Sequence, residues 1–453
     1  MTYSSLVPTD SYGYRLTTSS EAAAAYNRGI GHLLRLRTGA VEALATSVAL
    51  DPTFALGHAA LALLGHEMCA PVDLRARLDH AALHAARASD RERSHVAAIT
   101  SHVRGSSAPL VRHLAAYPRD ALLLTTAVPT IAFAGVTEVP AEGWVLVERA
   151  IPAYGDDWWF AGLLAFVRQE QRRFDEAMSL ACRSLAREPD AGHSAHARAH
   201  AHYETGDHEA GLSWMDGWVT GAGAGSGSRS HFSWHAAMHE LSLGDLDAVR
   251  RRYDAQLRPV PGLGCRTLVD SGSLLFRWGL TPGAVDVPGI EDVATVVGRE
   301  VLEAPATPFL AMHAAVTLLA LDDGPALARL AVRAERHPQP TQREVVAPLV
   351  RALALMRAEH CSQAADALAA LTGALPRLGG SDAQREIIEE TRIAALLRAG
   401  RLADARAVLD VRLDRRRSPR DEAWRRSCSA PDDSQSGQAH LAALDGHRDL
   451  LER

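Results

Sequence analysis

The stretch Arg172-Arg173-Phe174-Asp175-Glu176-Ala177 decides the fold, because it joins two helical patterns through a tight turn. In a tetratricopeptide unit, the second helix carries a small residue five positions after the turn and ends at a proline. Ala177 and Pro189 satisfy both conditions. Similar turns follow at Gly206 and Gly244, so the successive spacings are 34 and 38 residues. The first spacing equals the tetratricopeptide period.

The composition favours an all-α chain. Ala and Leu dominate, aromatic residues make up only 5%, and both Ala and Leu are strong helix formers. Apolar residues recur at i, i+3 and i+4, the spacing of one helix face, in segments 22–36, 74–88, 92–103 and 385–397. We therefore expect an all-α, tetratricopeptide-like helical-repeat solenoid that curls around a central pocket.

Three regions are expected along the chain. An N-terminal extension covers residues 1–20, the solenoid covers 21–415 with a histidine-rich core region at 50–280, and a mobile tail covers 416–453. The tail begins beside three arginines and continues in Ser-, Asp- and Gln-rich sequence, which is typical of unfolded segments. The Gly/Ser-rich segment 221–228 accounts for the four extra residues of the longer spacing, and we interpret it as a flexible lid or linker.

The chain contains no lysine, since all 48 of its basic Lys or Arg residues are arginines. This excludes a pyridoxal-phosphate enzyme, a Walker-type nucleotidase and a protein kinase, each of which needs a specific lysine. The net charge of −6 argues against nucleic-acid binding. The five scattered cysteines, and the lack of a signal peptide or a membrane-length apolar run, predict a cytoplasmic protein without membrane contact. The arginine and alanine bias is typical of a GC-rich bacterial genome.

Histidine is the functional residue that this sequence enriches. Eight of its 21 histidines lie between residues 193 and 239. His196 and His200 are one helical turn apart, as are His231 and His235, so each pair shares a helix face. Both pairs fall on the first helices of neighbouring repeats, and such helices line the concave face of a solenoid. We expect the two pairs to meet across one groove.

These histidines have three interpretations. They can transfer protons or hold a polar ligand, since imidazole titrates near neutral pH. They can bind zinc or another divalent metal through His196, His200 and His235, although no HExxH motif or thiolate pair supports this. They can also be packed, hydrogen-bonded groups at alanine-rich helix contacts. We expect no cofactor on the first interpretation.

Several blocks of sequence between about residues 50 and 280 resemble the tetratricopeptide repeat protein 38-like family, which occurs in bacteria and animals. The blocks are Asp90-Arg-Glu-Arg-Ser-His95-Val, Tyr117-Pro-Arg-Asp-Ala121, Gly162-Leu-Leu-Ala-Phe166, His196-Ala-Arg-Ala-His200, His231-Phe-Ser-Trp234-His235, Tyr253-Asp254 and Leu268-Val-Asp270-Ser-Gly-Ser273-Leu-Leu-Phe-Arg277. The resemblance implies an α-solenoid in which these blocks converge, but it names no reaction.

The resemblance also implies site residues. Those at its motif positions are His95, His196, His200, His231, Trp234, His235, Asp270 and Arg277, with His58 as a further candidate. The family pattern has Glu three residues after the second histidine of its first motif. Here Tyr203 occupies that place and Glu204 follows it, so both are candidate ligand-binding residues whose exchange could change the activity.

We expect a small-molecule enzyme or binder, in bacterial secondary metabolism, that uses these histidines for acid–base chemistry or polar-ligand binding. Asp270 would orient one imidazole, as a carboxylate does in a catalytic triad, and Arg277 would pair with an anionic group. The alternative is a tetratricopeptide scaffold that binds a partner protein or peptide in its concave face. The absence of lysine and the single asparagine, Asn27, disfavour a carboxylate-clamp type of peptide binding.

Overall fold

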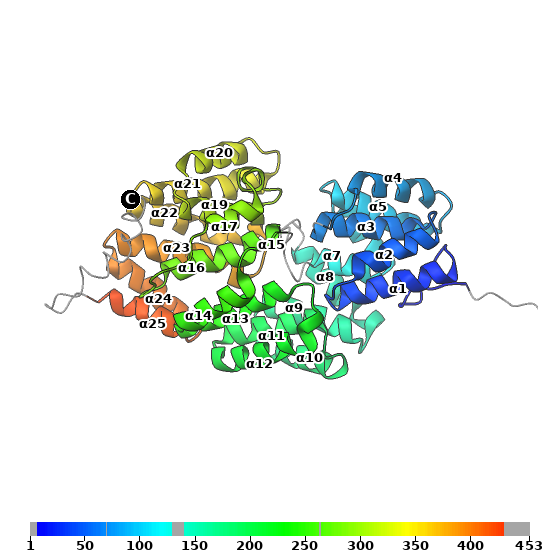
Figure 1. Ribbon diagram of the computed structural model, residues 1–453, viewed down its shortest axis with the longest axis horizontal. Coiled ribbons are helices and arrows are strands. Elements are labelled where there is room, and N and C mark those ends of the chain that lie inside the picture. Colours follow the sequence, from blue (N-terminus) through cyan, green and yellow to red (C-terminus); the bar gives the residue numbers. More distant parts are fainter. Residues whose placement is uncertain (1–6, 69, 129–139, 262–263, 430–453) are drawn as a thin grey trace, which may run out of the picture. The chain divides into compact units, whose positions relative to one another are not determined.

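The computed structural model describes residues 7–68, 70–128, 140–261 and 264–429, and these residues are mostly helical (Figure 1). Within them, the only extended pairings are two isolated bridges, so the predicted all-α class is confirmed. The chain divides into two compact units. Unit 1 contains the chain up to Ala201 together with Gly217–Arg229, and unit 2 contains His202–Asp216 and the chain from Ser230 onward.

Unit 1 is a series of helix pairs with short connections, in which α1 packs on α2, α3 on α4, α5 on α6 and α9 on α10 (Figure 1). Its complete helices are α1 (Ser20–Leu34), α2 (Ala40–Leu50), α3 (Ala55–Met68), α4 (Leu74–Ala85), α5 (Asp90–Val103), α6 (Ala108–Ala116), α7 (Ala121–Ala127), α8 (Pro140–Tyr154), α9 (Trp158–Glu170), α10 (Phe174–Arg187) and the 3₁₀ turn η1 (Ala222–Gly225). Two further helices, α11 (Gly192–Thr205) and α12 (His208–Thr220), contribute several residues to each unit, and unit 1 also includes Arg229, the first residue of the next helix.

Unit 2 continues the pattern of paired helices, and α20 to α23 pack one on the next. Its helices are α13 (Arg229–Leu243), α14 (Leu246–Arg252), α15 (Cys265–Thr267), α16 (Ser273–Leu280), α17 (Glu291–Val297), α18 (Arg299–Glu303), α19 (Pro308–Ala320), α20 (Gly324–Glu335), α21 (Ala347–Arg357), α22 (Cys361–Leu371), α23 (Asp382–Arg398), α24 (Leu402–Arg415) and α25 (Pro419–Ser427). Three π-helical turns, η2 (Tyr253–Leu257), η3 (Leu268–Gly272) and η4 (Gln342–Val346), and the 3₁₀ turn η5 (Thr372–Leu378) complete it.

The predicted repeat turns are present where the spacing placed them. Arg172, Gly206 and Gly244 adopt φ values of 61°, 74° and 78°, and each stands between two helices. A left-handed residue ends the first helix of a pair and lets the chain reverse, which is easiest for glycine. The helix-pair repeat is thus observed, while its assignment to the tetratricopeptide type stays a prediction.

Two expectations about loose segments are wrong. The predicted mobile tail starts too early, because residues 419–427 form α25 and Arg416 is 5% exposed; the tail from residue 430 onward lies outside the described residues. The segment 221–228 is no flexible lid, since it forms η1 and is pinned inside unit 1. The backbone N–H of Gly227 and the hydroxyl of Ser226 both donate to the carbonyl of Leu36, over 2.8 and 3.1 Å.

Among the described residues, we find no helix with both the length and the apolar character that crossing a bilayer requires.

Candidate functional site

The face of α13 in unit 2 carries three buried aromatic side chains from the predicted site. His231, Trp234 and His235 are 1–2% exposed. The ring of His231 stacks on that of Trp234, with a centroid distance of 5.5 Å and an interplanar angle of 10°. His235 packs edge-on against both rings, at 4.8 and 4.9 Å. The spacing of these residues along one helix explains the grouping, because i, i+3 and i+4 positions share a face.

Asp270 on η3 lies directly against this group. Its Oδ1 accepts a hydrogen bond from Nδ1 of His231 over 2.8 Å, and both side chains are 1% exposed. Its Oδ2 accepts from the hydroxyl of Ser230 over 3.3 Å. A carboxylate oxygen accepts, so this contact is made by an N–H at Nδ1 of His231; in a neutral imidazole bonded in this way, Nε2 is the nitrogen with the lone pair. Such an imidazole can act as a base or as a metal ligand through Nε2.

The same segment of chain also fixes Trp234. Its indole Nε1 donates to the hydroxyl of Ser273 over 2.9 Å, and that hydroxyl lies 3.3 Å from the backbone oxygen of Asp270. The hydroxyl of Ser271 donates in turn to the carbonyl of Leu257 over 2.6 Å. Asp270 and Ser273 therefore hold the aromatic side chains of α13 in place through hydrogen bonds.

His196 and His200 form a buried pair in unit 1, on α11. Their Nε2 atoms lie 3.0 Å apart, so one ring donates and the other accepts. Phe166 of α9 stacks on His196, with centroids 5.2 Å apart, and meets His200 edge-on at 5.7 Å. The predicted i, i+4 pairing is present. The zinc alternative needs these two residues together with His235, which belongs to unit 2, and it stays a prediction.

Tyr203 and Glu204 lie in an ionic network of unit 2. The hydroxyl of Tyr203 donates to Glu386 over 2.8 Å, and Arg416 donates to Glu204 over 3.1 Å. The guanidinium of Arg416 also stacks over the Tyr203 ring, at 4.2 Å, and pairs with Glu386. Burial raises the pKa of Glu386, but Arg416 and the neighbouring arginines outweigh it and hold that pKa well below its usual range. Both predicted ligand-binding residues thus join the end of α11 to α23 and α24.

Arg277 of α16 forms ion pairs and hydrogen bonds within unit 2. It is fully buried, and its guanidinium donates to Glu390 over 2.9 Å and to the carbonyl of Ala383 over 2.6 Å. Arg420 contacts the same glutamate over 2.9 Å. The anionic group that we expected Arg277 to bind is therefore a carboxylate of the chain itself. A paired, buried arginine of this kind holds helices together rather than recruiting a substrate.

His95 contributes to a buried polar cluster in unit 1. Its Nδ1 lies 2.7 Å from Oδ2 of Asp120, and the same oxygen accepts from Nε2 of His113 and from Arg91, over 3.1 and 2.7 Å. Asp120 also caps the N-terminus of α7. Burial raises the pKa of Asp120, but His95, His113 and Arg91 hold it well below its usual value. This cluster is a buried ionic hub centred on Asp120.

Two further histidine groups lie in unit 1. His58 on α3 stacks with His80 and His84 of α4. Elsewhere, Nε2 of His102 lies 2.6 Å from Glu67, which is also 3.8 Å from His66. Sequence reasoning singled out His58 but missed these companions. The i, i+4 spacing of His80 and His84 was a signal for the first group, whereas the helix contact that brings in His102 has no local signature.

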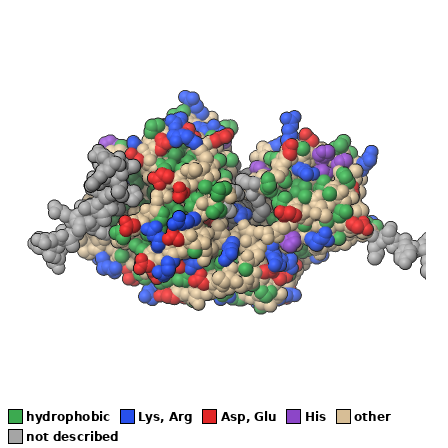
Figure 2. All heavy atoms as spheres, in the orientation of Figure 1, with side chains coloured by type: hydrophobic (Ala, Val, Ile, Leu, Met, Phe, Trp, Pro, Cys, Tyr) green, Lys and Arg blue, Asp and Glu red, His purple; other side chains and the backbone are tan. Residues whose placement is uncertain are grey.

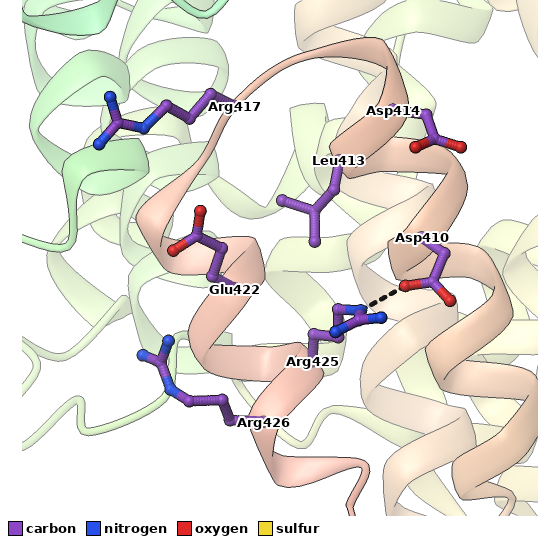
Figure 3. A pocket seen from close by; sticks show the side chains of 7 residues that line it. All are labelled: Asp410, Leu413, Asp414, Arg417, Glu422, Arg425 and Arg426. Carbon is purple, nitrogen blue, oxygen red and sulfur yellow. Dashed lines mark hydrogen bonds and ion pairs between the residues drawn. The ribbon is translucent and has the colours of Figure 1, made fainter.

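A surface hollow lies between α24 and α25 of unit 2, with a volume of about 740 Å³ (Figure 3). Acidic and basic side chains surround it, and Arg425 pairs with Asp410 across one side. Its lining residues are Asp410, Leu413, Asp414, Arg417, Glu422, Arg425 and Arg426. None of the predicted site residues is among them. The chain matches no known protein-family profile.

Proposed function

We propose that this chain is a small-molecule enzyme or binder whose reactive group is His231, oriented by Asp270. The observation that carries the proposal is the 2.8 Å contact between Nδ1 of His231 and Oδ1 of Asp270, with both side chains 1% exposed. A carboxylate in this position fixes the tautomer of the imidazole and stabilises the imidazolium that forms when Nε2 takes a proton. Burial strengthens this effect, because the local dielectric is low.

The neighbours of the pair support a polar ligand of small size. Trp234 covers one face of His231, and His235 supplies a second imidazole beside it. Since the chain has no lysine, an acidic ligand can be held only by arginine, histidine or helix N-termini. We extend the proposal to membership of the tetratricopeptide repeat protein 38-like family, which rests on the same blocks of sequence.

The test combines ligand stabilisation with turnover. The full chain and its His231→Ala and Asp270→Asn variants are screened by thermal shift and by absorbance against p-nitrophenyl esters, phosphates and glycosides. We expect at least one compound to stabilise the wild-type chain and to turn over. His231→Ala should abolish that turnover, and Asp270→Asn should lower it by about 10²–10⁴-fold, the range seen when an oriented base is lost.

A matched control is Asp207→Asn, which alters the exposed carboxylate 3.3 Å from Nδ1 of His202 in the same unit. It should leave both readouts unchanged. The proposal is wrong if no compound stabilises the wild-type chain, or if each compound that does so acts equally on His231→Ala. The alternative function, a tetratricopeptide scaffold for a partner peptide, would then be the better explanation.

A further inference from the structure

Three imidazoles lie together on the outer side of α3 and α4 in unit 1. His58 is 3% exposed, while His80 is exposed and His84 is half-buried. The rings are nearly parallel, with centroids 5.0 Å apart for His58 and His80, and 5.9 Å for His58 and His84. One nitrogen from each ring lies within 4.8 Å of the others. Histidine side chains are visible on the surface of this unit over α4 (Figure 2).

The buried member of the group is already oriented. Nε2 of His58 lies 2.9 Å from the carbonyl oxygen of Pro52, which can only accept, so Nε2 carries the proton and Nδ1 carries the lone pair. A backbone carbonyl that fixes the tautomer from the far side is the usual support of a metal-bound histidine. In the structure, the Nδ1 lone pair accepts from the guanidinium of Arg77 over 3.3 Å.

We propose that His58, His80 and His84 form a binding site for a divalent transition metal of the zinc type. Zinc takes imidazole nitrogens at about 2.0–2.1 Å, which places tetrahedral ligand atoms about 3.3 Å apart. To bind one ion, the two less buried side chains of α4 move closer and their rings turn, because nearly parallel rings direct their lone pairs side by side and not toward one point. Arg77 is partly exposed and can swing away from Nδ1.

Because His80 is exposed, the proposed metal site is open to solvent. Three protein ligands leave a fourth position, and on this open side of α4 the fourth ligand is water. Three histidines with an open position are the arrangement of reactive zinc sites, whereas structural sites are closed by four protein ligands. The site therefore takes up and releases metal more readily than a structural one.

Another polar cluster of unit 1 fits a metal less well. In the His95 and His113 group, the shared oxygen of Asp120 already accepts from Arg91 over 2.7 Å, and all three candidate ligands are fully buried. A cation there would have to displace a buried guanidinium. The His58 group has an entry path from solvent, and its competing guanidinium is partly exposed.

The experiment is metal titration of the full chain after chelator treatment. ZnCl₂ binding is followed by calorimetry, and CoCl₂ binding is followed through the visible absorption bands of the tetrahedral ion. We expect His80→Ala and His84→Ala each to lose one equivalent of Zn²⁺ or to weaken it at least tenfold, with loss of the Co²⁺ bands. Both positions are at least partly exposed, so these variants should keep the fold.

His360→Ala is the control, since this histidine is exposed and makes no capping hydrogen bond at the start of α22. Arg77→Gln should bind Zn²⁺ at least as tightly as the wild-type chain, because it removes a competing cation. Equal stoichiometry and affinity in wild type, His80→Ala and His84→Ala would overturn the proposal, as would weaker binding by Arg77→Gln. The readout is metal binding, so it is independent of any turnover that depends on His231.

Discussion

Among the described residues, a buried aspartate contacts Nδ1 of a histidine at nearly the same distance in each unit. The distance from carboxylate oxygen to Nδ1 is 2.7 Å for Asp120 and His95 in unit 1, and 2.8 Å for Asp270 and His231 in unit 2. The surroundings differ. Asp120 also accepts from a guanidinium and a second imidazole, whereas the other contact of Asp270 is the hydroxyl of Ser230.

If the proposed function holds, the counter-charge, and not the pair itself, separates a structural role from a reactive one. The charge of Asp120 is already balanced by Arg91, so little of it is left to stabilise a proton arriving on His95. Within the described part of unit 2, Asp270 has no arginine partner, and its charge is directed at His231. Because the dielectric constant of the protein interior is low, the negative charge of Asp270 interacts strongly with a proton on His231.

The largest effect should come from removing the balancing guanidinium. Arg91→Met leaves the buried carboxylate of Asp120 without its cation, and we expect a loss of about 3–5 kcal/mol in the free energy of unfolding. Urea denaturation followed by circular dichroism measures it. The control is Arg93→Met on the same helix, whose ion pair with Asp90 is exposed and which should cost within about 0.5 kcal/mol. Equal losses in the two variants would contradict the structural role of Arg91.

A smaller effect separates the two carboxylates. Asp120→Asn weakens charge-assisted hydrogen bonds from three donors, and we expect it to cost about 2–3 kcal/mol in the free energy of unfolding. Asp270→Asn keeps an acceptor for His231 and should cost about 1 kcal/mol. The two variants are compared in parallel urea titrations. If the second loss equals the first, Asp270 is a structural hub like its counterpart in unit 1.

The smallest effect is a pH dependence at the unit 1 cluster. Burial lowers the pKa of His113, although its bond to Asp120 opposes this shift. Between the ordinary histidine pKa of 6.5 and the lower folded value, the unfolded chain binds a proton that the folded chain does not, so stability falls as the pH falls. The limit is about 1.4 kcal/mol per pH unit for one such group.

The melting temperature of the His113→Gln variant should therefore fall less than that of the wild-type chain when the pH is lowered from about 7 to about 5. Buried histidines elsewhere act with the same sign, since burial lowers the pKa of both His193 and His313 to about 3, so the decline is reduced and not abolished. Thermal denaturation at each pH measures the slope. His360→Gln, which changes an exposed histidine, is the control. If the melting temperature of His113→Gln falls with pH as steeply as that of the wild-type chain, the lowered pKa of His113 is contradicted.

The helix pairs could be predicted from the sequence because each turn depends on the conformation of one or two neighbouring residues. Arg172, Gly206 and Gly244 take left-handed conformations at the predicted turns. The polar partners were harder to predict, since they depend on how helices pack across the sequence. Tyr203 meets Glu386, which is 183 residues away, and Arg277 meets Glu390, which is 113 residues away. Spacing within one helix gives no information about such partners.

The length of the turn η3 determines whether Asp270 can contact His231. A π-helical turn holds one residue more than an α-helical turn, because its hydrogen bonds span five residues and not four. Removing one residue from Leu268–Gly272 would restore an ordinary α-helical turn and rotate Asp270 by about 100° relative to α16. The carboxylate would then leave His231 while most side chains of the helix stayed in place. The pair thus depends on the number of residues in this turn as much as on their identity.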